Sequence, residues 1–383
     1  MRRFWLIFAQ TTTIAVAVVF VLRTFAPQWL ASPRAPAGSG TPPVAMLAAA
    51  PVPAAASYSA AAHRAMPAVV SVTSTRIAPG SAGSALDRFF GLPAQRPRVG
   101  LGSGVIVSPD GYILTNNHVV EGAQEIEVRL ADRREASARV VGRDPDTDLA
   151  VLRIDLHDLP TLAFADDTHA RVGDVVLAIG YPFGVGQTVT QGIVSALRRN
   201  ELGINTYENF IQTDAAINPG NSGGALVDVE GNLLGINTAI FSRSGGSLGI
   251  GFAIPASTAR NVMRQLIATG HVLRGWIGVE PATIGPTRAQ ALRLPPGADL
   301  EIAAVLRGGP ADRAGVEPGD VVLDVAGHVV HDTGDLLNAV AALQPGSTVD
   351  LRVLRKGRQA VLRVKVAQRP SDASSADPGD DGS

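Results

Sequence analysis

Three residues of reactive types stand far apart in the sequence, each in a distinctive setting. His118 lies within Thr-Asn-Asn-His-Val-Val, Asp148 opens Asp-Leu-Ala-Val, and Ser222 lies within Gly-Asn-Ser-Gly-Gly. A histidine can take the proton of a serine hydroxyl while a carboxylate orients the imidazole, which creates a nucleophile for acyl transfer. Taken singly, each has an ordinary explanation: a core histidine, a turn aspartate or a plain glycine turn. Together, in the order His, Asp, Ser, they predict a catalytic triad.

The glycines beside Ser222 add a second feature of such a site. Gly220, Gly223 and Gly224 allow a tight backbone path that L-residues with side chains rarely adopt. A path of this kind can direct successive backbone N–H groups at one point, which is how an oxyanion hole is made. The loop therefore supplies both a nucleophile and donors for a developing negative charge.

The composition narrows the chemistry further. The chain of 383 residues has no cysteine, and lysine occurs only at Lys356 and Lys365. A thiol nucleophile, a Cys-zinc site and a disulfide framework are excluded, and histidine remains as the base. The net charge is −1, the pI is near 6.7, and no basic stripe with aromatics occurs, so no nucleic-acid partner is indicated. No cofactor and no metal site are expected.

The elements that must position these residues are mainly β. Short apolar runs separated by turn residues fill the chain from Ala68 to about Ile254, and Ser108-Pro109-Asp110-Gly111 is typical of a hairpin turn. Many short strands without helices predict an antiparallel barrel or a pair of barrels. The clearest expected strands begin at Val69, Val105, Tyr112, Ile126, Leu149, Val175 and Ala225.

A helix and a second folded unit follow. Val262, Leu266 and Ile267 share one helical face within residues 256–268, and Gly270 can end that helix. Trp276 to about Ala367 predicts a further unit of strands with one short helix. The expected boundaries are an N-terminal anchor or signal at 1–30, a flexible Ala/Pro linker at 31–57, a catalytic domain at 58–270, a second domain at 271–368 and a disordered tail at 369–383.

The N-terminal sequence predicts a targeting signal. An apolar run from Phe4 to Leu22 follows Arg2 and Arg3, and at about 1.5 Å per residue it can cross a hydrocarbon core of roughly 30 Å. It lacks a small-x-small cleavage site, which favours an uncleaved membrane anchor with the rest of the chain outside the cytoplasm. A cleaved secretory signal is the alternative, and it leads to the same compartment.

Five segments together resemble the HtrA/Deg family of trypsin-fold serine proteases. The resemblance covers about Ser57 to Ala367. It implies a mainly β fold, with a trypsin-like double β-barrel protease domain followed by a small α+β PDZ domain. The segments are Gly102–Ile106, Thr115–Val119, Asp148–Val151, Gly192–Ser195 and Asn218–Gly224.

The resemblance gives each member of the triad a role in a serine endopeptidase. His118 is expected to be the general base, Asp148 its orienting carboxylate and Ser222 the nucleophile. Asp144 and Asp146 are rivals for the carboxylate. Asp148 is preferred because it directly precedes the Leu-Ala-Val strand, as in the family motif, and the other two are expected to face solvent.

The same resemblance assigns the binding groups around the triad. The oxyanion hole is expected at Gly220-Asn221-Ser222, with the N–H groups of Gly220 and Ser222 as donors. No acidic residue lies in the expected specificity pocket, so a small aliphatic side chain before the scissile bond is predicted. The glycine-rich loops 181–188 and 241–249 are expected to be mobile, and in the family such loops switch the oxyanion hole. The pocket residues are Ile217, Asn237, Thr238, Ala239 and Ile240.

The C-terminal unit is similar to a bacterial PDZ domain. Such a domain adds an extended peptide to a sheet edge and holds the peptide carboxylate with backbone N–H groups. A structural β-module without peptide binding is the alternative. The expected carboxylate loop is Trp276, Ile277, Gly278 and Val279.

One PDZ domain with an N-terminal anchor resembles the membrane-anchored, DegS-type stress-sensor proteases. These cleave an anti-sigma factor when C-termini of misfolded proteins bind the PDZ domain, and they assemble as trimers, for which Tyr58 is a candidate contact. The segment Asp87–Gly91, however, is similar to a loop of the soluble protease-chaperones. A general degradative protease-chaperone therefore stays open, as does a peptide-binding scaffold without catalysis. The expected partners are protein or peptide substrates, C-terminal peptides, the inner membrane of the bacterial envelope and two further copies of the chain.

Overall fold

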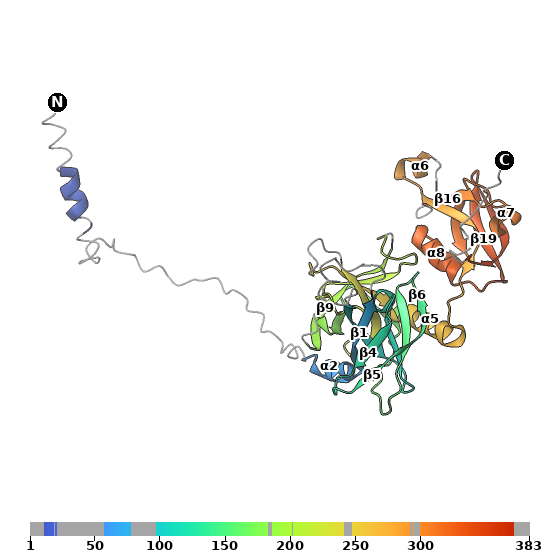
Figure 1. The fold of residues 1–383 in the computed structure, drawn as a ribbon. Helices are drawn as coiled ribbons and strands as arrows, with labels where there is room; N and C mark the ends of the chain where they lie inside the picture. The colour runs from blue at the N-terminus through green and yellow to red at the C-terminus, as the bar shows by residue number, and fades with distance from the viewer. Residues whose placement is uncertain are drawn as a thin grey trace, which may run out of the picture. The chain divides into compact units, whose positions relative to one another are not determined.

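The computed structural model describes residues 11–18, 20, 57–77, 97–182, 186–200, 202–240, 247–291, 294 and 299–370. Residues 1–56 form a unit separate from the rest, within which 11–18 and 20 are helical (Figure 1). None of the helices in these ranges has the length and apolar character needed to span a membrane. Most of the apolar run at 4–22, nearly all of the linker at 31–57, the segment 87–91 and nearly all of the tail lie outside the described residues.

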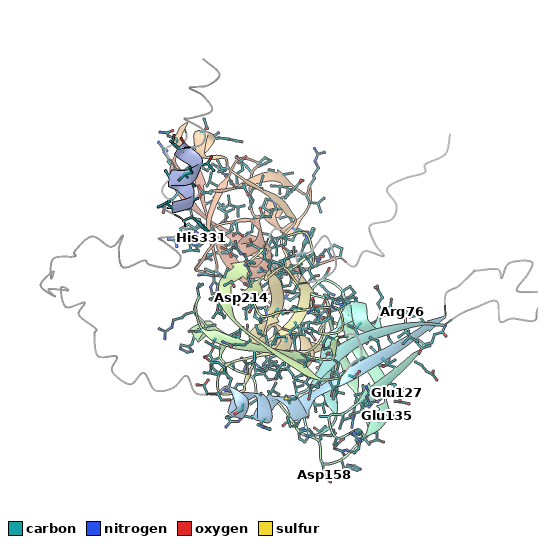
Figure 2. The ribbon with its side chains drawn as sticks, turned by 90° about the vertical axis from the view of Figure 1, so that its left-hand side faces the viewer. Arg76, Glu127, Glu135, Asp158, Asp214 and His331 are labelled. Atoms are coloured by element: carbon teal, nitrogen blue, oxygen red, sulfur yellow. The ribbon has the colours of Figure 1, made fainter. Side chains whose placement is uncertain are left out.

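The first half of residues 57–270 is a seven-stranded antiparallel sheet in the order β5-β4-β1-β2-β3-β7-β6. A short helix, α2 (Ser59–Ala65), and a 3-10 turn, η2 (Met66–Ala68), precede it. β1 and β2 form a long ribbon, and Figure 2 shows Arg76 near its outer end, with Glu127 and Glu135 on the neighbouring strands β4 and β5. The strands are β1 (Val69–Ile77), β2 (Pro97–Ile106), β3 (Tyr112–Asn116), β4 (Glu125–Arg129), β5 (Glu135–Ser137), β6 (Arg139–Asp144) and β7 (Leu149–Arg153).

The second half closes into a six-stranded barrel in the order β10-β13-β12-β11-β8-β9. The pairing of β12 with β13 shifts register between Asn237 and Ala239, so Thr238 has no cross-strand partner there. Such a bulge redirects one side chain without breaking the sheet. A turn, η3 (Asp167–His169), comes before the strands β8 (Val175–Gly180), β9 (Thr188–Arg199), β10 (Phe210–Thr213), β11 (Ala225–Val227), β12 (Leu233–Ile240) and β13 (Gly251–Pro255).

One hydrophobic core joins the two halves. Leu114 and Leu149 of the first sheet and Ile179 and Ile236 of the barrel belong to the same buried cluster. Each such side chain contributes roughly 1.5–3 kcal/mol when it is removed from water. The shared core fixes the ends of β3 and β7 against the barrel, where the three reactive residues lie.

The predicted closing helix is α5 (Ala256–Thr269). Val262 and Leu266 are buried in the shared core, whereas Ile267 is 37 % exposed. Gly270 ends the helix in the left-handed conformation, with φ of 77°, and its N–H bonds to the Leu266 carbonyl. Glycine adopts that conformation without the steric cost of a Cβ atom.

The C-terminal unit has a core of its own around a sheet in the order β15-β16-β17-β19-β20, with β18 paired to β17. β14 and β21 form a separate pair. The helix α8 packs beside β14, β15 and β17. The elements are β14 (Gly275–Trp276), β15 (Val279–Thr283), α6 (Pro286–Ala291), β16 (Leu300–Val305), α7 (Pro310–Arg313), β17 (Val321–Val325), β18 (His328–Val329), α8 (Thr333–Ala341), β19 (Thr348–Arg355), β20 (Arg358–Lys365) and β21 (Ala367–Gln368).

Candidate active site

His118 and Asp148 come together because β3 and β7 are neighbours. Asn116, the last residue of β3, pairs with Leu149, the first residue of β7. His118 Nδ1 lies 2.7 Å from Asp148 Oδ2. The histidine side chain is 49 % exposed, whereas that of the aspartate is 12 % exposed. A buried carboxylate at Nδ1 leaves Nε2 as the ring nitrogen free to accept a proton.

Asp148 is held from several directions. Its Oδ1 accepts from the His118 backbone N–H at 2.9 Å, and its backbone oxygen accepts from the Asn116 side chain and the Asn117 N–H. Its φ of 58° lies in the left-handed region, which aspartate tolerates better than most residues. Strained backbone of this kind persists only where the surroundings fix it, and it gathers at functional sites.

Thr238 supplies a third hydrogen bond to the same carboxylate. Its hydroxyl donates to Asp148 Oδ2 at 2.8 Å, and the residue is 4 % exposed. The β12 bulge is what directs this side chain to the first sheet. Sequence reasoning placed Thr238 in a specificity pocket, and no motif in the sequence reveals the bulge that gives it another contact.

Ser222 lies on the loop between β10 and β11 and is half-buried. Its hydroxyl donates to the backbone oxygen of Thr238 at 3.2 Å. Within the part of the chain that the structure describes, no hydrogen bond joins this hydroxyl to the His118 ring. The histidine and aspartate are thus paired, while the serine hydroxyl is engaged elsewhere; such contacts often tighten only when substrate is bound.

The backbone of the Ser222 loop is tightly packed. Gly223 has a φ of 84°, and a Cβ atom there would lie 2.1 Å from the Ser103 carbonyl oxygen, which only glycine avoids. Among the described residues, the N–H groups of Gly220 and Ser222 have no acceptor. The Asn221 N–H instead donates to the Asn218 oxygen at 2.9 Å, so the expectation that Asn221 contributes to the oxyanion hole does not fit this arrangement.

The residues predicted to wall a specificity pocket lie in different surroundings. Ile217 is 1 % exposed and packs against Gly251, where a Cβ atom would meet its side chain at 2.8 Å. Asn237 is fully buried, and its side chain donates to the Ala225 oxygen. Together with Thr238, Asn237 is therefore directed at the protein and not at a substrate. Ala239 and Ile240 complete β12, and their side chains lie outside what is described.

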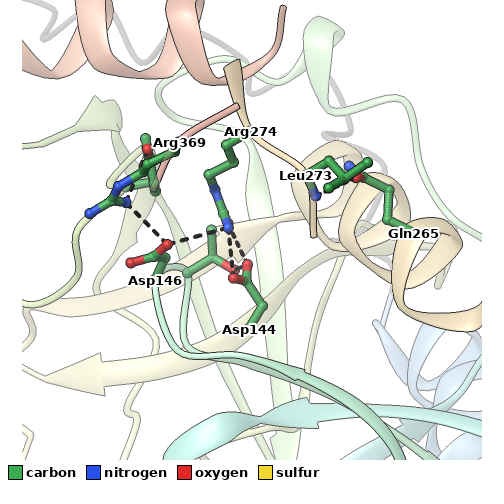
Figure 3. A network of polar contacts seen from close by, with 8 residues as sticks. Asp144, Asp146, Gln265, Leu273, Arg274 and Arg369 are labelled. Atoms are coloured by element: carbon green, nitrogen blue, oxygen red, sulfur yellow. Dashed lines mark hydrogen bonds and ion pairs between the residues drawn. The ribbon is translucent and has the colours of Figure 1, made fainter. Parts of the chain in front are cut away.

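The two rival carboxylates lie in a separate charged cluster (Figure 3). Asp144 is 4 % exposed and receives two hydrogen bonds from the Arg274 guanidinium, at 2.8 and 2.5 Å. Asp146 accepts from Arg369 at 3.1 Å. The expectation that both face solvent was wrong for Asp144, because an arginine 130 positions later in the chain pairs with it.

Comparisons with known proteins agree with this arrangement. Residues 102–236 match the trypsin-like peptidase domain, and residues 275–366 match the PDZ domain. The HtrA-type protease AlgW, solved with a tripeptide, is 51 % identical, with a TM-score of 0.72 over 83 % of this chain and 99 % of that one. The chain belongs to the HtrA-type serine proteases. Its fold is the mainly β, trypsin-like protease unit followed by one PDZ domain that the sequence predicts.

Curated relatives of this HtrA-type protease are longer than the chain. A probable periplasmic serine endoprotease, DegP-like, from Pseudomonas fulva is 48 % identical over 73 % of this chain and 58 % of its own length. The protein of the same description from Chlamydia pneumoniae is 46 % identical over 75 % of this chain and 60 % of its own length. The chain thus spans about three fifths of the length of these relatives.

The PDZ unit of this HtrA-type protease has an edge strand at β15. Among the described strands β15 pairs with β16 alone, and α8 packs beside β15. Gly278, just before β15, has a φ of 76° and lies against the ring of Trp276, while Ile277 is buried in the core of the unit. The predicted carboxylate loop, Trp276 to Val279, thus stands at the start of this edge strand.

The PDZ unit also contacts the protease loop that connects β9 and β10. The Asn200 side chain donates to Asp332 at 2.7 Å, and the Asn338 side chain donates to the Glu208 backbone oxygen at 2.7 Å. The buried Glu208 carboxylate in turn accepts from three backbone N–H groups of that loop: Leu202, Ile204 and Asn205. The contacts from the PDZ unit are therefore made beside a segment, 202–208, whose backbone is held by the Glu208 carboxylate.

Proposed function

We propose that this HtrA-type protease is a serine endopeptidase in which His118, Asp148 and Ser222 form the triad. The observation that carries the proposal is the buried Asp148 carboxylate, 2.7 Å from His118 Nδ1, beside the glycine loop of Ser222. An aspartate in this position sets the tautomer of the histidine and stabilises the imidazolium that forms during catalysis.

The chemistry is acyl transfer in two stages. Ser222 Oγ attacks the peptide carbonyl carbon while His118 Nε2 takes its proton, and the N–H groups of Gly220 and Ser222 hold the oxyanion. His118 then gives the proton to the leaving amine, and the C–N bond breaks. A water molecule, activated by the same imidazole, releases the second product from Ser222. Before the first stage, the Ser222 hydroxyl must turn from the Thr238 oxygen towards the imidazole.

The substrates are protein chains with a small aliphatic side chain before the scissile bond. The support is the family resemblance, which assigns Ile217, Ala239 and Ile240 to the pocket wall, and all three of these residues are apolar. An acidic residue in that position would select arginine or lysine.

The PDZ unit binds free C-termini of proteins and regulates cleavage. Its support is the edge strand β15 beside α8, an arrangement that accepts an added strand. The similar AlgW was solved with a tripeptide and with a decapeptide. By this proposal, misfolded envelope proteins present their C-termini, and the enzyme then cleaves a membrane-bound anti-sigma factor.

The same proposal places the enzyme in the bacterial periplasm, anchored by the apolar run at 4–22 and assembled as a trimer with Tyr58 at the contact. The curated relatives are named periplasmic, which supports the compartment. Their DegP-like description also favours a second candidate, a general protease-chaperone that degrades unfolded envelope proteins.

The test uses the purified full chain with two substrates, reduced casein and a membrane-protein fragment of the anti-sigma type. Peptides that end in a free hydrophobic carboxylate are added, and the same peptides with a C-terminal amide are the matched control. We expect activation by the free acids alone and labelling of Ser222 by a serine-directed phosphonate. Equal cleavage with both peptide forms would remove the regulatory role and favour the general degrader. If no adduct formed at Ser222, a peptide-binding scaffold without catalysis would be the remaining explanation.

A further inference from the structure

Ser103, in the middle of β2, is a fully buried serine that the mechanism above does not use. Its hydroxyl donates to the Gly220 oxygen at 2.6 Å and accepts from the Tyr181 N–H at 2.9 Å. The side chain thus reaches from the first sheet into the second half of the molecule. Both partners are backbone groups, and one of them belongs to the nucleophile loop.

The backbone of Ser103 makes two more contacts in the same place. Its N–H donates to the Ser222 oxygen at 2.8 Å, and its carbonyl oxygen accepts from the Thr115 hydroxyl at 2.7 Å. Thr115 stands three positions before His118 on the strand that leads to the histidine. One residue therefore joins the loop of the nucleophile to the strand of the base.

These contacts fix alternate peptide planes around Ser222. The Gly220–Asn221 plane is held by Ser103 Oγ at its oxygen and by the Asn218 oxygen at its N–H. The Ser222–Gly223 plane is held by the Ser103 N–H at its oxygen and by the Asn237 oxygen at its N–H. Between them lies the Asn221–Ser222 plane, whose N–H has no acceptor among the described residues.

Fixing both neighbours of that plane also fixes the direction of its free N–H. The plane has one bond of its own, from the Gly224 N–H to the Asn221 oxygen at 2.9 Å. Donors that point at a developing oxyanion accelerate a reaction because they are already oriented before the charge forms. The hydroxyl of Ser103 provides such orientation without touching the substrate.

We propose that Ser103 is a positioning residue for the oxyanion hole: its hydroxyl holds the Gly220 carbonyl and thereby helps to fix the direction of the Ser222 N–H. The inference rests on the proposed function, since that function gives the Ser222 N–H the role of an oxyanion donor. A hydroxyl that acts in this way affects the transition state and leaves the binding of the ground-state substrate nearly unchanged.

The test compares Ser103→Ala with wild type in the full chain. The substrate is a chromogenic peptide with a small aliphatic residue before the scissile bond, and the inhibitor is the matching peptide boronic acid, whose adduct with serine is a tetrahedral anion with one oxygen in the oxyanion position. Loss of a whole oxyanion donor costs about 10²–10³ in kcat, so loss of its support should cost about tenfold or more. KM should stay within about threefold, and boronate affinity should fall in step with kcat.

Two further variants serve as a matched control and as an intermediate case. Ser74→Ala is the matched control, because Ser74 is a fully buried serine of the same β1–β2 ladder whose hydroxyl has no partner among the described residues, and it should keep wild-type kcat. Ser103→Cys replaces the hydroxyl with a weaker donor and should fall between wild type and Ser103→Ala. If Ser103→Ala does not fold, the cysteine variant carries the same comparison.

Each outcome has one meaning. An active wild type with Ser103→Ala within threefold of its kcat would overturn the positioning role alone. Equal losses in Ser74→Ala and Ser103→Ala, or a loss confined to KM, would do the same, because they would indicate general destabilisation or altered substrate binding. A wild type that neither cleaves the peptide nor reacts with a serine-directed phosphonate would overturn the proposed function, and this inference with it.

Discussion

Asp144 and Asp148 are buried carboxylates four positions apart, yet their surroundings differ in kind. Asp144 meets the permanent charge of Arg274 and the Thr147 hydroxyl, whereas Asp148 meets the ring of His118 and the hydroxyl of Thr238. An arginine carries a permanent charge, whereas a neutral imidazole has one ring nitrogen that can accept a proton. One short turn thus holds an ion pair suited to joining domains and a carboxylate–imidazole pair suited to moving a proton.

The two aspartates also differ in where their partners lie in the sequence. The partner of Asp148 comes from the adjacent strand of the same sheet, so the pair forms when β3 and β7 pair. The partner of Asp144 lies just before β14, at the entry to the PDZ unit, where the Arg274 and Arg369 guanidinium groups also lie over the Tyr207 ring at 4.6 and 5.3 Å. Figure 3 shows Arg274 and Arg369 converging on the two aspartates.

The strongest test of the comparison is Asp148→Asn. The amide would favour the wrong imidazole tautomer, and in well-studied triads this lowers kcat about 10⁴-fold while the geometry is kept. Activity on the chromogenic peptide measures the effect. Asp146→Asn is the control, because Asp146 bonds to arginines and not to the histidine, and its kcat should stay within a few-fold of wild type. Similar losses in both variants would show that the carboxylate was assigned wrongly.

Arg274→Met should have its main effect on stability. It leaves the Asp144 carboxylate buried without its cation, and breaking a buried pair in this way costs about 3–5 kcal/mol. Urea unfolding followed by circular dichroism measures the change. The matched control is Arg363→Met, since Arg363 and Asp350 form a solvent-exposed pair at 3.9 Å, whose removal should cost about 1 kcal/mol or less. Equal costs would contradict the burial argument.

Sequence reasoning succeeded where a short segment carries the information. The family motifs located the trypsin-like and PDZ units, and the period of Val262 and Leu266 with the stop at Gly270 predicted α5. The α5 prediction needed only the spacing of apolar residues and a glycine that accepts positive φ.

It failed where a contact depends on distant segments. Asp144 was expected at the surface because nothing near it announces Arg274. Thr238 was predicted only as part of a pocket wall, and its hydrogen bond to Asp148 depends on a bulge in β12 that leaves no mark on the residue pattern. Ser103 stood inside a quoted motif, but its hydrogen bonds to Gly220 and Tyr181 exist only after the two halves have packed.

Thr238→Val examines how much the third hydrogen bond of Asp148 contributes. The change keeps the shape and removes the donor, and a hydrogen bond to a charged group contributes about 1.5–3 kcal/mol, so kcat should fall about 10- to 100-fold. KM should change little. Thr190→Val is the control, because that hydroxyl donates to the neutral backbone oxygen of Ala216 and should give a loss of stability without a matching loss of kcat. Unchanged kcat in Thr238→Val would mean that the histidine alone orients the carboxylate.

Tyr207→Phe should have the smallest effect of these variants, and it tests the cluster around Arg274 and Arg369. The hydroxyl accepts a hydrogen bond from Arg369 at 3.1 Å, so its loss should cost about 1 kcal/mol in urea unfolding while the ring keeps its stacking with Arg274.

Burial raises the pKa of Tyr207 above its usual 10.0. A raised pKa in the folded state means that the folded protein holds the proton longer, so stability falls as the pH rises above about 10. Wild type should show this decline in unfolding free energy more steeply than Tyr207→Phe. If the unfolding free energies of wild type and Tyr207→Phe changed with pH in parallel, the Tyr207 hydroxyl would be in contact with water. The stabilising cluster would then consist of the two arginines and two aspartates alone.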